Sequence, residues 1–593
     1  MSFSVKNITG ALKIIWKSSP LWSLTNIVLS VLRGILPLIL IYIVKLVIDD
    51  VIRIASTGNP LLTDAEIINT FILAGIFFLL NSFTSAVSSF VRQKQSYLVT
   101  DYIQNLIHQK TINIPYRYFE DSEYQNIFYR AIEEASYRPS RVFYGLLGLL
   151  QNSVTLALII GILITLHWGV LPYLLLISVP IVAFQLYYSK LFYFLKRDQT
   201  EEERKVNYYN RLLTSKDYAK ELRIFNLGQH FKENYETLRG GLREKQINLI
   251  KKRTLWETLV QVIATVFLLM IFGYIIYSTV TKSISTGDMA MYFLALHRGY
   301  SVLQEWLSRI SSLYEDNLFL KNFFEFLKIQ VKEDPSSSLH FPKPIKEHIT
   351  FKDVSFKYPN TKRWVLKDVN FSIKAGETVA IVGTNGAGKT TLVKMLAGLY
   401  KPTTGDITVD GTDWTQIRSD ELADAVTVIF QDFMLYNVSA KKNIWYGNIK
   451  REPDDSPIRE AAKNAGIHDM FMNLPKGYET TLGTLFKNSE QLSRGEWQRT
   501  ALARSFFNDA QLIILDEPTS SLDAFTEAGL LKYFGEIASG RTAIIISHRL
   551  TTIRLADRII VLDGHGVAET GTHKELLRQT GVYQDLYTDL NLQ

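Results

Sequence analysis

The amino-terminal half of this 593-residue chain contains repeated apolar segments of bilayer length. A helix crosses the hydrocarbon core with about 20 predominantly apolar residues. Segments of this kind recur before residue 315 and are absent after it. The sequence therefore predicts an α-helical membrane part with six crossings, followed by a soluble part. The expected spans are residues 22–48, 67–91, 142–166, 169–188, 256–280 and 288–313, the last being the least apolar.

The distribution of basic residues predicts the orientation of these spans. Two long polar stretches, 92–141 and 190–253, carry most of the lysines and arginines, whereas the short links contribute only Arg53 and Lys282. Basic loops stay in the cytosol. We therefore expect a multi-pass protein of the cytoplasmic membrane with both long loops, both termini and the soluble part in the cytosol.

Both long polar stretches have apolar residues at helical spacing, which indicates spans that continue as helices beyond the bilayer. Residues 121–127 and 215–223 lie near the middle of these excursions. We expect them to form cytoplasmic tips on which the soluble part acts.

Composition removes some classes of function and leaves others open. The chain has no cysteine, so a disulfide framework is impossible. The net charge of +7 is typical of either a nucleic-acid partner or basic cytosolic loops, and the spans favour the loops, with no nucleic acid bound. No removable signal peptide is expected. Near the start, one helical face carries Ile8, Leu12, Ile15 and Trp16, which fits a helix in the membrane interface or one packed on protein.

Charged residues within the sixth span form a stripe. Arg298, Glu305 and Arg309 fall within about 40° of one another on a helix. Because charge facing lipid is costly, this stripe should face a partner helix or a wet cavity. One interpretation is a substrate cavity, and the other is an internal ion pair between Glu305 and Arg309. Weaker candidates near helix ends are Arg33, Lys45 and Glu257.

A glycine-rich loop stands between an apolar strand and a helix in the soluble part. Residues 383–390 read GTNGAGKT. Glycines allow successive backbone N–H groups to approach phosphates, the lysine reaches the outer phosphates, and the final hydroxyl can hold Mg²⁺. The sequence predicts ATP as a ligand. The residues expected to bind it are Gly383, Thr384, Asn385, Gly386, Ala387, Gly388, Lys389, Thr390 and Thr391.

The remaining soluble sequence is organised around this loop. A stretch rich in proline and serine, residues 331–347, indicates a linker between a membrane domain at 1–330 and a second domain at 348–593. Strands and helices then alternate, which is typical of an α/β P-loop nucleotide-binding domain. The expected strands are 349–351, 379–382, 426–430, 511–516 and 542–547.

Further motifs follow the phosphate loop in a fixed order: FQDF, LSRGEWQRTALARS, LIILDEPTSSLDA and IISHR. Together they resemble the nucleotide-binding domain of the ABC (ATP-binding cassette) family. The resemblance implies that Glu517 positions the attacking water, that His548 reaches the γ-phosphate, and that Gln431 senses both the water and the metal. It also implies Mg²⁺ ligands in Thr390, Gln431 and Asp516, while Tyr358 would stack on adenine or, alternatively, serve as a core aromatic.

In this family the signature segment completes the ATP site of the opposite subunit. The residues implied to act in trans are Ser493, Arg494, Gly495, Glu496 and Asp523. The chain departs from the usual LSGGQ at Arg494 and Glu496 but keeps Gly495, where close approach to phosphate is needed. An arginine beside ATP is electrostatically reasonable, and Glu496 could pair with it. We expect an altered but active site.

Six spans and a single carboxy-terminal cassette resemble an exporter-type half-transporter, which implies a homodimer working by alternating access. The segments DSEYQNIFYRA, KELRIFNLG and FQDFMLYNVSAKKNI are similar to bacterial exporters of lanthipeptides. This resemblance implies export of a modified peptide, with its biosynthetic enzymes as possible partners, but without a cysteine peptidase domain. The alternatives are a flippase for lipids or lipid-linked glycans, a multidrug exporter, and an ATP-gated regulatory membrane protein. Intact Glu517 and His548 argue against a pure regulator.

Overall fold

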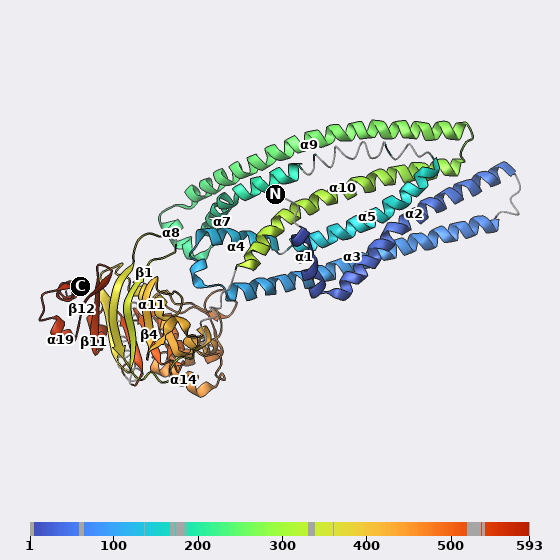
Figure 1. Cartoon of the computed structure of the whole chain (residues 1–593). Helices are drawn as coiled ribbons and strands as arrows, with labels where there is room; N and C mark the ends of the chain where they lie inside the picture. Colours follow the sequence, from blue (N-terminus) through green and yellow to red (C-terminus); the bar gives the residue numbers. More distant parts are fainter. Residues whose placement is uncertain are drawn as a thin grey trace. The chain divides into compact units, whose positions relative to one another are not determined.

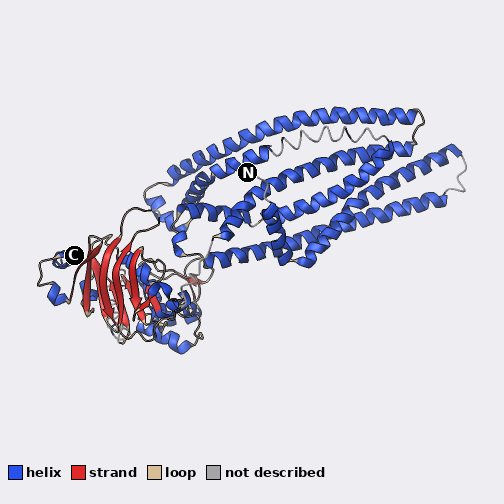
Figure 2. Cartoon of the chain, in the orientation of Figure 1, coloured by secondary structure: helices blue, strands red, loops and turns tan. Residues whose placement is uncertain are grey.

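The structure is a computed structural model that describes residues 5–57, 64–135, 137–166, 172, 184, 187–329, 339–359, 361–518, 535 and 540–591. The chain divides into two compact units. The helical unit comprises Met1–Ile114 and Ser122–Gln330, and the α/β unit comprises Pro115–Asp121 and Val331–Gln593. In the described part of the chain, regular strands occur in the α/β unit and not in the helical unit (Figure 2).

Long helices make up the helical unit (Figure 1). With 53 residues, α9 is about 80 Å long at 1.5 Å per residue, far more than the ~30 Å hydrocarbon core. The prediction that spans continue as helices beyond the bilayer is therefore confirmed. The helices are α1 (Val5–Ser18), α2 (Pro20–Thr57), α3 (Asp64–Ile112), α4 (Ser122–Ala135), α5 (Arg138–Leu166), α7 (Thr200–Thr214), α8 (Ala219–Ile224), α9 (Gly228–Val280) and α10 (Thr286–Lys328).

Four helices in the described residues are long and apolar enough to cross a membrane. They correspond to the expected spans one, two, three and five: Pro20–Arg53, Ile68–Ile112, Arg138–Leu166 and Gly228–Val280. The fourth expected span, 169–188, lies almost entirely outside the described residues. The sixth lies within α10, which is not among the four. The charged stripe of this helix lowers its hydropathy, although it packs extensively against α5 and α2.

The first chain reversal differs from its predicted position. It lies at residues 113–121, where α3 ends at Ile112 and the short helix η2 (Tyr116–Tyr118) follows. The predicted tip, 121–127, is mostly the beginning of α4. Pro115 explains the shift, because a proline disfavours helical geometry in the residue before it. The second reversal falls where expected, in η3 (Lys216–Tyr218) and α8.

Small and apolar residues hold the helical unit together. Gly34 on α2 lies against α5, where its carbonyl accepts a hydrogen bond from the Thr155 hydroxyl at 2.8 Å. Helix α1 packs on protein through Ala11 and Ile15, which are buried, while Trp16 is exposed. The face of α1 that carries Ala11 therefore packs on protein, which is one of the two interpretations of this helix.

Two of the weaker charged candidates have local partners. Lys45 forms an ion pair with Asp288 at 2.6 Å, and Glu257 pairs with Arg253 at 2.8 Å, one helical turn away. Neither needs a substrate to satisfy its charge. Arg33 pairs with no carboxylate in the described part of the chain and instead donates to the Ser88 hydroxyl at 3.2 Å.

The α/β unit contains two main sheets. The first is antiparallel, with strand order β2-β1-β4-β5, and the second has the order β12-β11-β3-β10-β9-β6, with β12 antiparallel to β11 and the others parallel. All five predicted strands are present. The strands are β1 (His348–Phe356), β2 (Leu366–Lys374), β3 (Thr378–Gly383), β4 (Thr404–Val409), β5 (Thr412–Asp413), β6 (Val426–Ile429), β7 (Thr481–Leu482), β8 (Ser489–Glu490), β9 (Leu512–Asp516), β10 (Thr542–Ile546), β11 (Arg558–Asp563) and β12 (Gly566–Gly571).

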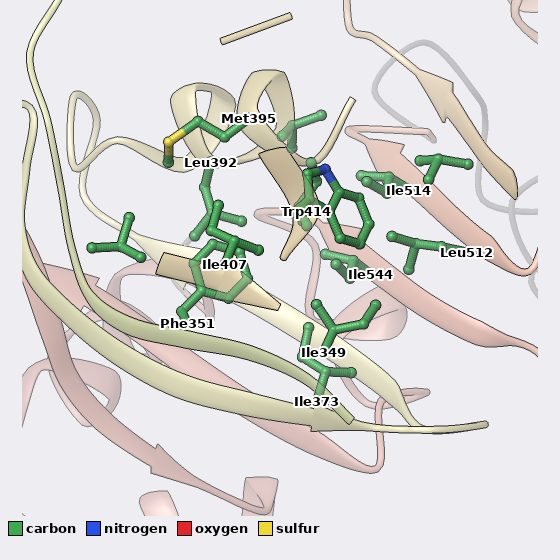
Figure 3. Close-up of a cluster of buried hydrophobic side chains, with 14 of the residues drawn as sticks. Ile349, Phe351, Ile373, Leu392, Met395, Ile407, Trp414, Leu512, Ile514 and Ile544 are labelled. Atoms are coloured by element: carbon green, nitrogen blue, oxygen red, sulfur yellow. The ribbon is translucent and has the colours of Figure 1, made fainter. Parts of the chain in front are cut away.

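Helix α11 packs into a core that joins the two sheets. Its residues Leu392 and Met395 share a buried cluster with Phe351 of β1 and Leu512 of β9 (Figure 3). Each such side chain contributes about 1.5–3 kcal/mol of burial. The further helices are α11 (Lys389–Leu396), η4 (Trp414–Gln416), α12 (Ser419–Ala425), α13 (Ala440–Trp445), α14 (Asp455–Asn464), α15 (His468–Met472), η5 (Gly477–Glu479), α16 (Arg494–Phe506), α18 (Leu550–Ile553), α19 (His573–Leu576) and α20 (Val582–Asn591).

The described part of the expected linker is packed rather than free. Leu339 bridges to Ile417, and Phe341 and Ile345 are buried in the core of the α/β unit. The Phe341 ring lies 5.8 Å from that of Trp414. From residue 339 onward, the stretch expected to be a linker therefore belongs to the α/β unit.

Candidate functional site

Four parallel strands bring the motif residues to one edge of the six-stranded sheet. Ile546 of β10 lies opposite Ile381 of β3 and Asp516 of β9, and Leu515 of β9 lies opposite Ile429 of β6. The segments that leave the carboxyl ends of these strands are the phosphate loop, Glu517, His548 and Gln431. This edge is where ligands bind in open α/β sheets.

The glycines of the phosphate loop are required by its backbone. Gly386 and Gly388 have φ angles of 84° and 95°, in the left-handed region that favours glycine. A Cβ at Gly388 would lie 2.5 Å from Leu366 Cδ2, whereas the space beside Gly386 is open. The loop ends at the amino terminus of α11, whose N–H groups and dipole favour an anion.

Lys389 lies across the loop. Its ammonium group donates to the carbonyls of Gly383 at 2.7 Å and Thr384 at 3.0 Å. Burial lowers the pKa of Lys389, while the carboxylates of Glu517 and Asp516 oppose that shift. An arriving phosphate would give this half-desolvated cation a stronger partner than two neutral carbonyls.

Asp516 fits the role of a magnesium ligand. Its carboxylate is buried, and the Thr390 hydroxyl interacts with the carboxyl group. The Oδ2 atom of Asp516 has no hydrogen-bond partner in the described residues. Burial, with the nearby Glu517 charge, raises the pKa of Asp516 to about 6. No cluster of three or more metal-binding side chains occurs in the described ranges. Mg²⁺ takes one or two protein carboxylates and completes its shell with water and phosphates, so a single buried carboxylate such as Asp516 is compatible with it.

The raised pKa of Asp516 predicts a pH dependence of magnesium binding. Because the carboxyl must lose its proton to bind a cation, apparent Mg²⁺ affinity should fall as pH drops through about 6. We expect about a tenfold loss for each further pH unit. Mg²⁺ titrations of ATP-bound protein between pH 5 and 8 measure this effect, and an affinity independent of pH would contradict it. The same raised pKa means that ionised Asp516 costs folding stability, so its contribution to stability falls as pH rises from about 4 to about 6.

Glu517 occupies a strained position beside two of the predicted catalytic residues. Its φ angle is 51°, which is unusual for a residue with a side chain and is typical of functional sites. Gln431 Nε2 donates to Glu517 Oε2 at 2.8 Å, and His548 Nε2 lies 3.4 Å from Glu517 Oε1. Burial, reinforced by the Lys389 charge, lowers the pKa of His548. His548 is therefore neutral at pH 7, and Glu517 is placed to accept a proton from water.

Tyr358 lies directly after β1 in an aromatic cluster. Its hydroxyl is 3.0 Å from Thr391 Oγ1, and its ring meets the Tyr400 ring edge-on at 5.5 Å. Lys394 Nζ lies 5.5 Å from the centre of the same ring. The Tyr358 ring is partly buried against the core, which fits a core aromatic. Its hydroxyl reaches α11, the helix that follows the phosphate loop, which fits a position beside a bound nucleotide. Both interpretations from sequence therefore stay open.

Glu120 completes this cluster and was not predicted. It accepts hydrogen bonds from Lys394 at 2.9 Å and from the Tyr400 hydroxyl. Burial alone would raise the pKa of Glu120, but these two bonds lower it below its usual value. Burial by itself would lower the pKa of Lys394, but the hydrogen bond to Glu120 raises the pKa of Lys394 above its usual value. The segment Pro115–Asp121 thus carries a carboxylate that holds Lys394 against the Tyr358 ring.

Replacing Glu120 with glutamine should weaken ATP binding moderately. Without the carboxylate, Lys394 is no longer held beside Tyr358, so the apparent Kd for ATP should rise about two- to fivefold, or about 0.5–1 kcal/mol. ATP binding by the full-length protein measures this change. Lys394→Gln should have the same effect, and the double variant should add nothing to it. Additive effects would show that the two residues act separately.

The signature segment begins helix α16. Ser493 is its N-cap, with Oγ accepting from the Glu496 N–H at 3.3 Å and Glu496 Oε2 accepting from the Ser493 N–H at 2.7 Å. Glu496 therefore completes a capping box, and no ion pair with Arg494 occurs among the described residues. The pairing with Arg494 that the sequence allowed is not formed here, and the spacing S-x-x-E carries the capping signal instead. Arg494 is exposed.

Comparison with known proteins places the whole chain. The ABC transporter transmembrane region matches residues 23–299, and the ABC transporter profile matches residues 366–520. The subtilin transport ATP-binding protein SpaT of Bacillus subtilis is 30% identical over 593 residues, which cover 98% of this chain and 94% of the relative. The chain belongs to the ABC transporter family. This ABC exporter couples ATP hydrolysis to transport, lies in the cell membrane, and carries its ATP-binding domain on the cytosolic side.

Two further similarities add to this assignment. The nisin transport ATP-binding protein NisT of Lactococcus lactis subsp. lactis is 27% identical over 590 residues, covering 99% of this chain and 96% of the relative. The solved structure of a bacterial Atm1-family ABC exporter with ATP bound matches this chain with a TM-score of 0.75 at 21% identity, covering 98% of both chains. At that identity the structural match supports the fold alone. The exporter-type fold predicted from sequence is confirmed.

The structure brings most of the predicted site residues together and leaves some apart. The phosphate loop, Asp516, Glu517, Gln431 and His548 share one sheet edge. Asp523 lies outside the described residues. Ser493 and Gly495 lie at the start of α16, and among the described residues neither forms a hydrogen bond with the phosphate loop of the same chain. In the helical unit, Arg298, Glu305 and Arg309 lie on α10, and Glu305 accepts from Asn152 at 3.4 Å without an ion pair to Arg309.

Proposed function

We propose that this ABC exporter moves a modified peptide out of the cytosol as a homodimer. The observation that carries the proposal is the end-to-end similarity to the subtilin and nisin transport proteins. The lipid A-core flippase of Alkalilimnicola ehrlichii has a higher identity of 35%, but over 334 residues that cover only 56% of this chain and 55% of the relative. Peptide export is therefore favoured over lipid flipping.

In the proposed cycle, two chains share two ATP sites. Lys389, Thr390 and the loop glycines of one subunit bind the phosphates, while Ser493 and Gly495 of the other subunit close over them. The amino terminus of α16, already ordered by its capping box, presents N–H groups and a favourable dipole for this contact. Arg494, being exposed, can add positive charge beside the γ-phosphate. We assign Glu496 to the same shared surface.

Hydrolysis in this proposal uses groups already positioned. Glu517 orients and deprotonates water, Gln431 holds its carboxylate from one side, and neutral His548 can hydrogen-bond a phosphate oxygen. Thr390, Asp516 and Gln431 would hold Mg²⁺, which would neutralise part of the phosphate charge. Closure of the cassettes would open the transmembrane cavity outward, and hydrolysis would reset it.

A transport experiment tests the peptide proposal. Inside-out vesicles containing the full-length protein are given ATP and one of three probes: nisin, a fluorescent phosphatidylethanolamine, or ethidium. We expect ATP-dependent accumulation of the peptide that exceeds that of vesicles containing a hydrolysis-deficient variant. Accumulation of only the lipid or the dye would refute peptide export and favour the corresponding alternative.

A further inference from the structure

Three arginines from three helices of the helical unit lie close together, two of them inside predicted spans and the third, Arg92, directly after the second predicted span. Arg33 is on α2, Arg92 on α3 and Arg309 on α10, and each interacts electrostatically with the other two. Arg33 is 13 residues into α2, or roughly 20 Å along the helix. In the predicted orientation the amino terminus of α2 is on the cytosolic side, so Arg33 lies on the part of α2 that is nearer to the cytosol.

Contacts with neighbouring residues fix the geometry of this arginine cluster. Arg33 donates to the Ser88 hydroxyl at 3.2 Å, and Ser88 lies one helical turn before Arg92 on α3. The Tyr144 hydroxyl of α5 donates to the backbone carbonyl of Arg92 at 2.6 Å. One turn further along α5, Gly148 leaves room for Arg309, because a Cβ there would lie 2.3 Å from the Arg309 Cζ. The glycine permits the guanidinium to lie flat against α5.

The cluster has no compensating negative charge in the described residues. None of its three members forms an ion pair, and the Nε atoms of Arg92 and Arg309 are buried without a hydrogen-bond partner. Glu305, one turn before Arg309, is bonded to Asn152 instead. The three side chains are half-buried, and an arginine taken partly out of water is usually paired, because an unpaired charge away from water is costly. Proteins keep such unpaired charges at functional sites, where a bound ligand supplies the opposite charge.

We infer that the arginine cluster binds an acidic group of the transported substrate, a carboxylate of the peptide. This inference rests on the proposed peptide export and names the chemistry of the part of the peptide that the cavity recognises. Guanidinium groups bind carboxylates through paired N–H donors, which would satisfy the orphan Nε atoms. Inside a largely apolar helix bundle, such a bond is less weakened by water than at the surface. A cationic segment of the same peptide would be repelled by the arginine cluster, and a neutral segment would form no ion pair with it.

Binding of two matched peptides to the full-length protein in phosphatidylcholine nanodiscs tests the inference. One probe carries glutamates, and its twin has glutamine at the same positions. The parental protein should bind the glutamate peptide about tenfold more tightly. Arg309→Gln and Arg92→Gln should each remove most of that preference. Lys321→Gln, an exposed charge on the same helix α10 that pairs with Glu325, should keep it. Equal binding of both peptides by the parental protein would overturn the inference.

Thermal stability without peptide separates a binding role from a structural one. If the arginines await a ligand, removing one relieves repulsion, so Arg309→Gln should melt no lower than Lys321→Gln. A melting temperature several degrees lower would show that Arg309 supports the fold, and would overturn the inference. Gly148→Ala offers a second probe, because its methyl group displaces the Arg309 side chain without changing charge, and should also reduce the preference for the glutamate peptide.

Two results identify which proposal fails. Transport of both peptides at equal rates in the vesicle experiment leaves peptide export standing and refutes the acidic-group inference. Charge-dependent binding without transport of either peptide refutes peptide export. A third result would assign the anion to lipid. In that case phosphatidylglycerol in the nanodiscs stabilises the parental protein and abolishes its preference for the glutamate peptide, but it does not stabilise the Arg309→Gln variant. The peptide assignment would then be overturned.

Discussion

Replacing Glu517 with glutamine is expected to leave ATP binding intact and to reduce steady-state hydrolysis by roughly 10²- to 10⁴-fold, the usual contribution of a general base. The amide keeps the size of the side chain but cannot accept the proton of the attacking water. It can still contact Gln431 and His548, which lie 2.8 and 3.4 Å from the carboxylate oxygens. The backbone strain at φ 51° is unchanged, because glutamine has the same Cβ.

Equilibrium ATP binding and phosphate release by the purified protein measure these two expectations. Glu460→Gln makes a matched control, since Glu460 is exposed on α14 and far in sequence from every motif residue. Hydrolysis near the parental rate in the Glu517 variant would assign the base elsewhere. Loss of ATP binding together with hydrolysis would instead show that Glu517 organises the phosphate loop.

The second large effect concerns sharing of the ATP sites between subunits. Lys389→Ala removes the cation that meets the phosphates, and Gly495→Asp adds a negative charge where the signature helix would approach them. Each homodimer should lose activity by roughly 10²-fold or more. An acidic residue in the first turn of α16 is compatible with the helix dipole, so Gly495→Asp should not prevent folding.

Mixed dimers distinguish shared from separate sites. When the two variants are purified together through different tags, one ATP site carries both defects and the other carries neither. If the sites act independently, activity should return to about half of the parental value per dimer. If each chain completed its own site, both sites would be damaged and the mixed dimer would remain inactive. That outcome would refute the proposed arrangement in trans.

Local patterns predicted the parts of the fold that depend on short stretches of sequence. The phosphate loop was recognisable because its glycines, lysine and threonine must be contiguous to surround phosphate, and Asp516 and Glu517 follow a short apolar strand for a similar reason. The spans described by the structure were visible because lipid requires long apolar helices. Even the Ser493–Glu496 capping box has a local signal, the spacing S-x-x-E.

Contacts between distant segments had no such signal. Glu120 meets Lys394 across 274 positions of sequence, and nothing in residues 115–121 indicates that partner. The first reversal was misplaced by several residues because tip position was inferred from the midpoint of a polar stretch rather than from Pro115. The stripe of Arg298, Glu305 and Arg309 was found by helical periodicity, but periodicity shows only which residues share a face of one helix.

From sequence alone, this chain is a membrane domain joined to an ATP-binding cassette, because bilayer thickness and phosphate chemistry each demand a contiguous pattern. Which charges meet depends on how the helices and strands pack. Packing brings Arg33, Arg92 and Arg309 together without a carboxylate partner among the described residues, and it aligns four strand ends at one edge of the sheet. The physical reason is that these interactions act through space over a few ångströms, whereas the residues concerned are separated by tens to hundreds of positions along the chain.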